Sequence, residues 1–221
     1  MTSKKPIYLY GAGGHSNVIR EVLESSGFAI KGAFDDKPEQ AKLRGIKVED
    51  GVRVLGQNFS KLDSPMIISV GSNLRRSELV ALLNAEYGLA VHGSAIISHT
   101  ASIGAGSVVL HGAIVQAGSK IGSHVLVNTA ASIDHDNVIE DYAHISPHAT
   151  LCGHVHVGEG THIGAGAVVI PCVRIGKWCK IGAGAVVIRD VPDFSTAVGN
   201  PARVIRTETS PATMDRYSDN D

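Results

Sequence analysis

The feature that most constrains this chain is a six-residue repeat that runs without a gap from Ile97 to Val187. Every sixth residue is aliphatic at all sixteen positions, and the residue four places later is mostly small, as at Ala101 and Ala113. A period of six fits neither an α-helix nor a simple strand. It is typical of a short strand followed by a turn, with one large side chain pointing inward on each of three faces. The repeat predicts a three-sided parallel β-solenoid of a little over five coils.

Residues 1–88 carry a different pattern. Strand-like runs alternate with helical patterns, which indicates a small parallel α/β domain of Rossmann type. The expected elements are strands at 6–10, 29–34 and 66–70, helices at 17–26 and around 79–83, and a last strand at 89–92 before the solenoid. We therefore predict an α/β domain over 1–88, a solenoid domain over 89–206, and a polar, disordered tail over 207–221.

Charge and cysteine content give no support for several protein classes. The 20 Lys and Arg residues nearly balance the 21 Asp and Glu residues, so a nucleic-acid partner or a membrane surface is not expected. We find no apolar run long enough to cross a bilayer and no signal-peptide core. The three cysteines, Cys152, Cys172 and Cys179, form no C-x-x-C pair, so a reducing cytoplasmic location is expected.

A glycine-rich loop, Gly11–Ser16, follows the first predicted strand. Backbone N–H groups at such a loop, next to a helix N-terminus, hold phosphate well. Ser16 stands where the dinucleotide fingerprint requires its third glycine, and so small a domain leaves little room for hydride transfer, so an NAD enzyme is disfavoured. The predicted nucleotide-binding residues at this edge of the sheet are Gly13, Gly14, His15, Asp35, Asp36 and Asn73. The alternative is a tight turn with two solvated acids and a helix N-cap.

One histidine in the repeat stands apart from the others, which we interpret as turn residues. His135 lies between Asp134 and Asp136 in the middle of the predicted solenoid. A carboxylate bonded to one imidazole nitrogen fixes the tautomer and makes the other nitrogen a better base. His135 is therefore a candidate general base, with a salt-bridged turn residue as the alternative. The spacing of the other histidines matches no common zinc pattern, and no metal is expected.

Four segments appear in a characteristic order: the opening strand and glycine loop (8–15), the hexads, the run 127–136 that ends in Asp-His-Asp, and the closing run 198–202. Together they resemble bacterial sugar acetyltransferases of the sialic-acid O-acetyltransferase type. That family includes enzymes that N-acetylate nucleotide-linked 4-amino-4,6-dideoxy sugars for glycan and O-antigen assembly. The resemblance covers about residues 6–206.

The resemblance implies a homotrimer of left-handed β-helices, with acetyl-CoA in the groove between neighbouring solenoids and no metal. It implies that His135 is the catalytic base and that Asp136 orients it, although Asp134 remains open for that role. Asn128 and His144 match further active-site positions, and Gly153 matches an oxyanion donor. The matches that line the coenzyme are Gly153, Ala165, Ala183, Asn200 and Pro201.

These implications predict direct attack of the sugar 4-amino group on the thioester, without an acyl-enzyme, because no cysteine pairs with His135 in the sequence. Three other readings stay open: O-acetylation of a sugar hydroxyl, a non-catalytic solenoid that binds or assembles partners, and the disfavoured NAD enzyme. The Asp35-Asp36 pair leads us to favour UDP over GDP as the nucleotide.

Overall fold

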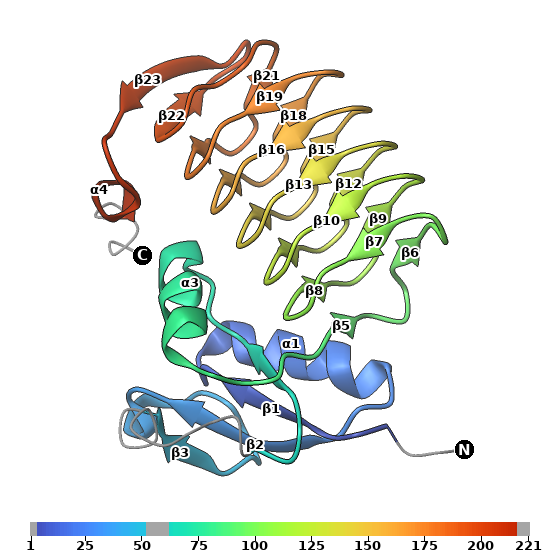
Figure 1. Ribbon diagram of the computed structural model, residues 1–221, viewed down its shortest axis with the longest axis vertical. Helices are drawn as coiled ribbons and strands as arrows, with labels where there is room; N and C mark the ends of the chain where they lie inside the picture. Colours follow the sequence, from blue (N-terminus) through green and yellow to red (C-terminus); the bar gives the residue numbers. More distant parts are fainter. Residues whose placement is uncertain (1–3, 52–61, 216–221) are drawn as a thin grey trace.

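The computed structural model describes residues 4–51 and 62–215 and places two domains end to end (Figure 1). The smaller domain holds a four-stranded parallel sheet in the order β3-β2-β1-β4. Its elements are β1 (Ile7–Tyr10), α1 (Gly14–Ser25), β2 (Ile30–Asp35), η1 (Pro38–Gln40), β3 (Val48–Asp50), β4 (Met66–Ile68) and α3 (Asn73–Leu82). The predicted α/β domain is therefore confirmed, although β3 was not anticipated. None of the helices in the described ranges is long and apolar enough to span a membrane.

The repeat forms a solenoid in which strands pair at a spacing of 18 residues, as Leu126 does with His144, and the last coil is shorter, since Lys180 pairs with Thr196. One sheet faces the α/β domain, and we call it the domain-facing sheet. Its strands are β5 (Ala90–Val91), β8 (Val108–Val109), β11 (Leu126–Val127), β14 (His144–Ile145), β17 (His162–Ile163), β20 (Lys180–Ile181) and β22 (Ser195–Val198), closed by the antiparallel β23 (Arg203–Thr207).

The other two sheets complete the triangle. The second sheet contains β6 (Ile96–Ile97), β9 (Ile114–Val115), β12 (Ser132–Ile133), β15 (Thr150–Leu151), β18 (Val168–Val169) and β21 (Val186–Val187). The third sheet contains β7 (Ser102–Ile103), β10 (Lys120–Ile121), β13 (Val138–Ile139), β16 (His156–Val157) and β19 (Arg174–Ile175). The aliphatic hexad residues are buried from Val109 onward and form one continuous core. Burial of this column is the main stabilising term of the solenoid.

The structure gives one expected strand its partner and corrects the prediction for the tail. The strand expected at 89–92, just before the hexads, pairs with Val108–Val109, so β5 is the first strand of the domain-facing sheet and lies inside the range 89–206 expected for the solenoid domain. The tail expected to be disordered contains a helix, α4 (Pro211–Asp215), which lies beside α3 (Figure 1). This tertiary contact has no signature in a local polar sequence. Residues 216–221 lie outside the described part of the chain.

The α/β domain packs on the solenoid through apolar side chains of α1. Ile19, Val22 and Leu23 are fully buried in one cluster with Val108 and Leu126 of the domain-facing sheet. The outward residues of this sheet are apolar only in its first strands, from β5 to β11, and α1 covers that end. The outward residues of the following strands, β14, β17 and β20, are polar. The packing therefore leaves a polar strip of the domain-facing sheet beside the glycine loop that begins α1.

Arg76 of α3 fixes the second contact between the domains. Its guanidinium is fully buried, and it donates to the carbonyl oxygens of His124 (2.8 Å) and Tyr142 (2.7 Å) in the solenoid. It also donates to the carbonyl oxygen of Val70 (3.0 Å) in its own domain. Within the described ranges, its hydrogen-bond acceptors are carbonyl and amide oxygens, and no carboxylate pairs with it. Burial lowers the pKa of Arg76 to about 9, so the guanidinium stays charged at neutral pH.

His124 gives the fold a predicted sensitivity to acid. Its ring is buried between Tyr87 and Tyr142, and burial together with the nearby Arg76 lowers its pKa to about 4, against a small opposing effect of Asp141. Between pH 6.5 and pH 4 the unfolded chain therefore binds a proton that the native chain does not. As the pH falls through that window, His124 alone should lower the free energy of unfolding by about 3 kcal/mol.

Urea denaturation at pH 7, 5.5 and 4.5 measures this effect. Asparagine tolerates the positive φ of 56° at position 124. The free energy of unfolding of a His124→Asn variant should therefore fall less steeply with decreasing pH than that of the parent chain. The exposed His148, which has a φ of 58°, provides the control as His148→Asn and should leave the slope unchanged. Equal slopes for all three proteins would contradict the assignment.

Candidate active site

His135 lies at the corner between β12 and β13, where the chain turns from the second sheet to the third. Its Nδ1 is 2.9 Å from Oδ2 of Asp136, and its backbone N–H donates to Oδ1 of Asp134 at 2.8 Å. Asp136 therefore contacts the imidazole, whereas Asp134 holds the backbone of the turn. The hydrogen bond that His135 makes to Asp136 raises the pKa of His135, and the same bond lowers the pKa of Asp136.

Gly153 lies directly against the other edge of this imidazole, one coil further along the solenoid. A Cβ on Gly153 would sit 2.6 Å from both Cε1 and Nε2 of His135, which is closer than atoms of this kind approach. The absence of a side chain is thus what gives the ring its space. Among the described interactions, no hydrogen bond joins the Cys152 thiol to His135. The geometry presents Nε2, the nitrogen that Asp136 leaves free, beside the Gly153 backbone.

A second group of predicted residues lies on the domain-facing sheet. Nδ2 of Asn128 is 3.0 Å from Nε2 of His144, and the His144 ring stacks on His162 with centroids 4.7 Å apart. Burial, then His162, Arg76 and His15, hold the pKa of His144 well below its usual value, so this imidazole is neutral. Because an amide nitrogen only donates, Nε2 of His144 accepts from Asn128.

The glycine loop approaches this second group. Burial and Arg76 lower the pKa of His15, and the charge of His15 contributes in turn to the lowered pKa of His144. Gly13 is the N-cap of α1 with no side-chain cap, and a Cβ on Gly14 would meet nothing within 4 Å. Ser16, at the missing third glycine, is fully buried and donates to the Gly11 carbonyl at 2.8 Å. The loop therefore leaves helix N–H groups available for a ligand.

The polar residues at this edge of the sheet are engaged with one another. Asp35 accepts from the backbone N–H groups of Ala12 (2.7 Å) and Lys37 (2.8 Å), so it shapes the glycine loop. Asp36 accepts from the Tyr10 hydroxyl and from the Arg75 guanidinium, each at 2.7 Å.

The electrostatics of Asp36 follow from these partners. Partial burial alone would raise its pKa, but the hydrogen bonds from Tyr10 and Arg75 outweigh burial and lower it. Asn73 bridges the domains by donating to the Gly160 carbonyl (3.0 Å) and accepting from Arg76 (2.8 Å). Asn73 thus has a positioning role in the structure that the sequence did not indicate.

Of the residues expected to line the coenzyme, Gly153 lies at the His135 corner, and the others gather at another corner of the solenoid. Ala165 and Ala183 are exposed and lie one coil apart. Their turns are joined by the hydrogen bond that the Gly184 N–H donates to the Ala165 carbonyl (2.8 Å). Asn200-Pro201, a cis peptide, continues this row in the turn between β22 and β23. These residues form one edge of the solenoid that ends at its last coil.

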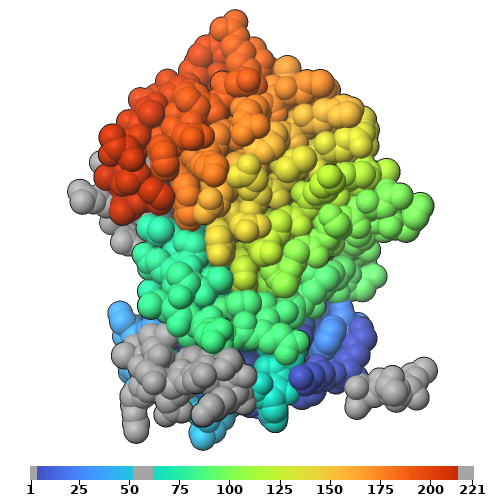
Figure 2. Space-filling model, in the orientation of Figure 1, coloured from blue at the N-terminus to red at the C-terminus, as the bar shows by residue number. Residues whose placement is uncertain are grey.

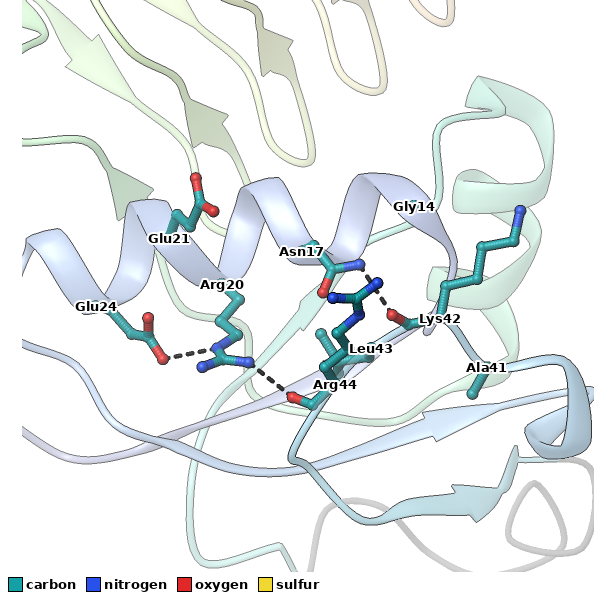
Figure 3. A pocket seen from close by; sticks show the side chains of 9 residues that line it. All are labelled: Gly14, Asn17, Arg20, Glu21, Glu24, Ala41, Lys42, Leu43 and Arg44. Carbon is teal, nitrogen blue, oxygen red and sulfur yellow. Dashed lines mark hydrogen bonds and ion pairs between the residues drawn. The ribbon is translucent and has the colours of Figure 1, made fainter.

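A pocket of about 710 Å³ lies between α1 and residues 41–44 (Figure 3). Arg20 spans it, bonded to Glu24 and to the Arg44 carbonyl. Gly14 is the one predicted site residue in its lining, and His135 lies far from it in the fold. The surface view likewise shows the solenoid as a closed, ridged body in that orientation (Figure 2). About half of the His135 side chain is exposed, so the elements of its own chain do not enclose this corner.

The structure thus divides the predicted residues between separate corners and sheets. His135, Asp136 and Gly153 share one corner, whereas Asn128, His144 and the glycine loop lie on and beside the domain-facing sheet. An imidazole with an open ring edge and a neutral, hydrogen-bonded histidine are suited to proton transfer and substrate orientation. The fold and this site define a hexapeptide-repeat acyltransferase.

Comparison with known proteins shows which acyltransferases the chain resembles. Residues 6–83 match the PglD N-terminal domain, and 138–170 and 154–189 match the bacterial transferase hexapeptide of six repeats. PerB of Caulobacter crescentus, solved with CoA and GDP-perosamine, is 33% identical with a TM-score of 0.85, over 91% of this chain and 97% of that one. A mutant of the perosamine N-acetyltransferase of the same organism, solved with the same ligands, matches with the same values. The acetyltransferase domain of PglB from Neisseria gonorrhoeae is 35% identical with a TM-score of 0.84, over 91% and 100%.

The chain belongs to this family of acetyl-CoA-dependent sugar N-acetyltransferases, and its solenoid is the left-handed parallel β-helix of that family. A curated sequence relative, the uncharacterized protein L142 of Acanthamoeba polyphaga mimivirus, is 30% identical over 104 residues. The matched residues make up 47% of this chain and 21% of that protein.

Proposed function

We propose that the protein transfers the acetyl group of acetyl-CoA to the 4-amino group of a nucleotide-linked 4-amino-4,6-dideoxy sugar, for bacterial glycan or O-antigen assembly in the cytoplasm. The observation that carries the proposal is the His135–Asp136 pair, held with one ring edge open against Gly153. The relatives that bind CoA and GDP-perosamine support it. Residues 1–88 are proposed to bind the nucleotide sugar, and residues 89–206 to carry out the transfer.

In the proposed reaction, Nε2 of His135 takes a proton from the sugar amine as the amine attacks the thioester carbonyl. Asp136 holds Nδ1 and stabilises the imidazolium that forms. The Gly153 N–H is proposed to receive the developing oxyanion, and CoA leaves as the thiol. No acyl-enzyme forms in this scheme.

We also propose that the working unit is a homotrimer. Because His135 and the Asn128–His144 pair lie on different parts of one solenoid, a complete site needs the His135 corner of one copy against the domain-facing sheet of the next. Acetyl-CoA would then run along the Ala165–Ala183 edge toward Asn200-Pro201. The nucleotide would lie at Gly13, Gly14 and His15.

A panel of UDP- and GDP-linked 4-amino sugars, incubated with acetyl-CoA and analysed by mass spectrometry, tests the proposal. Acetylation of an amino sugar, with none of the matched 4-hydroxy sugar, is the expected result, and the panel identifies the nucleotide. Faster acetylation of the hydroxyl compound would establish an O-acetyltransferase. No turnover and no thermal stabilisation by acetyl-CoA would favour a non-catalytic binding protein.

Gly153→Ala is expected to lower kcat by about a hundredfold, because the new methyl group displaces the His135 ring and a shift of about 1 Å at a reacting group has that cost. Steady-state kinetics with the acetylated sugar as readout measure the change. Gly71→Ala is the matched control, since a Cβ there meets nothing within 4 Å. Equal kcat values for both variants would contradict the contact.

A further inference from the structure

The acid that orients His135 has a second imidazole beside it. Nε2 of His154, one coil further on, is 3.7 Å from the same Oδ2 of Asp136 that is 2.9 Å from Nδ1 of His135. The rings of His135 and His154 meet edge to face with centroids 5.1 Å apart. Two imidazoles therefore converge on one carboxylate from neighbouring coils.

This arrangement has the dimensions of a metal site. One ligand atom from each of His135, Asp136 and His154 lies within 4.8 Å of the others. Zinc bound tetrahedrally at its usual bond lengths keeps neighbouring ligand atoms roughly 3.3 Å apart, a value between the two distances observed. All three side chains are about half exposed in the single chain, so a hydrated ion can reach them there and keep water as its fourth ligand.

We propose that His135, Asp136 and His154 form an inhibitory binding site for a divalent transition-metal ion, with Zn²⁺ as the preferred probe. Two imidazoles and a carboxylate are ligands that Zn²⁺ favours, and they disfavour Mg²⁺, which prefers oxygen ligands and water. The metal is an inhibitor in this proposal, and the acetyl transfer does not require it.

The tautomer of His135 explains how the ion would inhibit. A neutral imidazole carries one N–H, and the bond to Asp136 keeps that proton on Nδ1 and leaves Nε2 as the acceptor. A metal ion on Nδ1 forces the proton to Nε2, so the nitrogen that faces Gly153 becomes a donor. It can no longer take a proton from the sugar amine. Zn²⁺ should therefore lower kcat without raising KM for either substrate. This effect rests on the proposed role of His135, whereas binding of the ion does not.

Two asparagine variants provide the comparison. His154 and His148 are both exposed and share the left-handed backbone of the same hexad position, with φ values of 59° and 58°. Asparagine tolerates that backbone conformation, so both substitutions preserve the turns. His154→Asn removes a ligand, whereas His148→Asn removes an exposed histidine away from the cluster.

The experiment titrates the metal-free full-length protein with ZnCl₂ by calorimetry and measures initial rates by chromatography of the acetylated sugar. Chromatography is needed because the released CoA thiol also binds zinc. We expect one ion per chain, a fall in kcat at constant KM, and reversal by EDTA. His154→Asn should raise the half-inhibiting zinc concentration at least about tenfold, and His148→Asn should leave it unchanged.

The two readouts separate the possible failures. No binding of zinc, or equal zinc sensitivity of His154→Asn and the parent chain, would overturn the site. Stoichiometric binding that depends on His154 but leaves kcat unchanged would keep the metal site. It would overturn both the inhibition and the role of His135 as the base.

Discussion

Replacement of His135 by alanine is expected to lower kcat by about 10²–10⁴-fold, the usual cost of losing a general base. The side chain is about half exposed on a solenoid corner and contributes nothing to the aliphatic core. The free energy of unfolding should therefore stay within about 0.5 kcal/mol of the parent value. Single-turnover kinetics together with urea denaturation measure both quantities.

The two aspartates beside His135 supply the matched control. Asp136→Asn removes the carboxylate that contacts Nδ1 and should cost activity on a similar scale, because the wrong tautomer becomes available. Asp134→Asn keeps an oxygen that can accept from the backbone N–H and should cost little. Near-normal turnover of His135→Ala would refute the base assignment. Loss of activity in Cys152→Ala would instead favour a covalent intermediate.

Replacement of Arg76 by methionine is expected to lower the free energy of unfolding by about 3–5 kcal/mol. The substitution preserves bulk but leaves the carbonyl oxygens of Val70, His124 and Tyr142 without this donor. Each buried, unpaired acceptor costs about 1–3 kcal/mol. Since two of these oxygens belong to the solenoid and one to the α/β domain, the loss falls on the contact between the domains.

Arg76→Lys separates the charge from the geometry. An ammonium group keeps the positive charge but lacks the planar fork that reaches both domains, so an intermediate loss of stability is expected. Urea denaturation gives the free energies, and hydrogen exchange should show the largest increase along α3 and at the His124 and Tyr142 turns. A loss below 1 kcal/mol in Arg76→Met would show that water replaces the guanidinium at this contact.

The solenoid could be predicted nearly completely from the sequence, because its core depends on a local, repeated choice. Each hexad places one aliphatic residue inward, and residues 18 apart must then pair, as Leu126 and His144 do. The α/β domain was predicted less fully. Its strand β3 was not anticipated because it is short and mostly polar, and the partner of β5 could not be predicted because a two-residue strand carries no signal about its partner.

The candidate site shows a similar division. The run Asp134-His135-Asp136 indicated a base and its orienting acid, but which aspartate contacts the ring depends on the turn geometry. The approach of Gly153 and His154 depends on the stacking of coils, which brings together residues 18 or 19 positions apart.

What the sequence alone determined is the solenoid, the α/β domain and the residue types at the His135 corner, because periodicity and local spacing encode them. Only the tertiary structure decided the role of Arg76, whose acceptors lie 48 and 66 residues away in the chain. It also decided the separation of His135 from the Asn128–His144 pair. A buried cation without a carboxylate leaves no local pattern, since its partners are backbone carbonyl oxygens that every residue possesses.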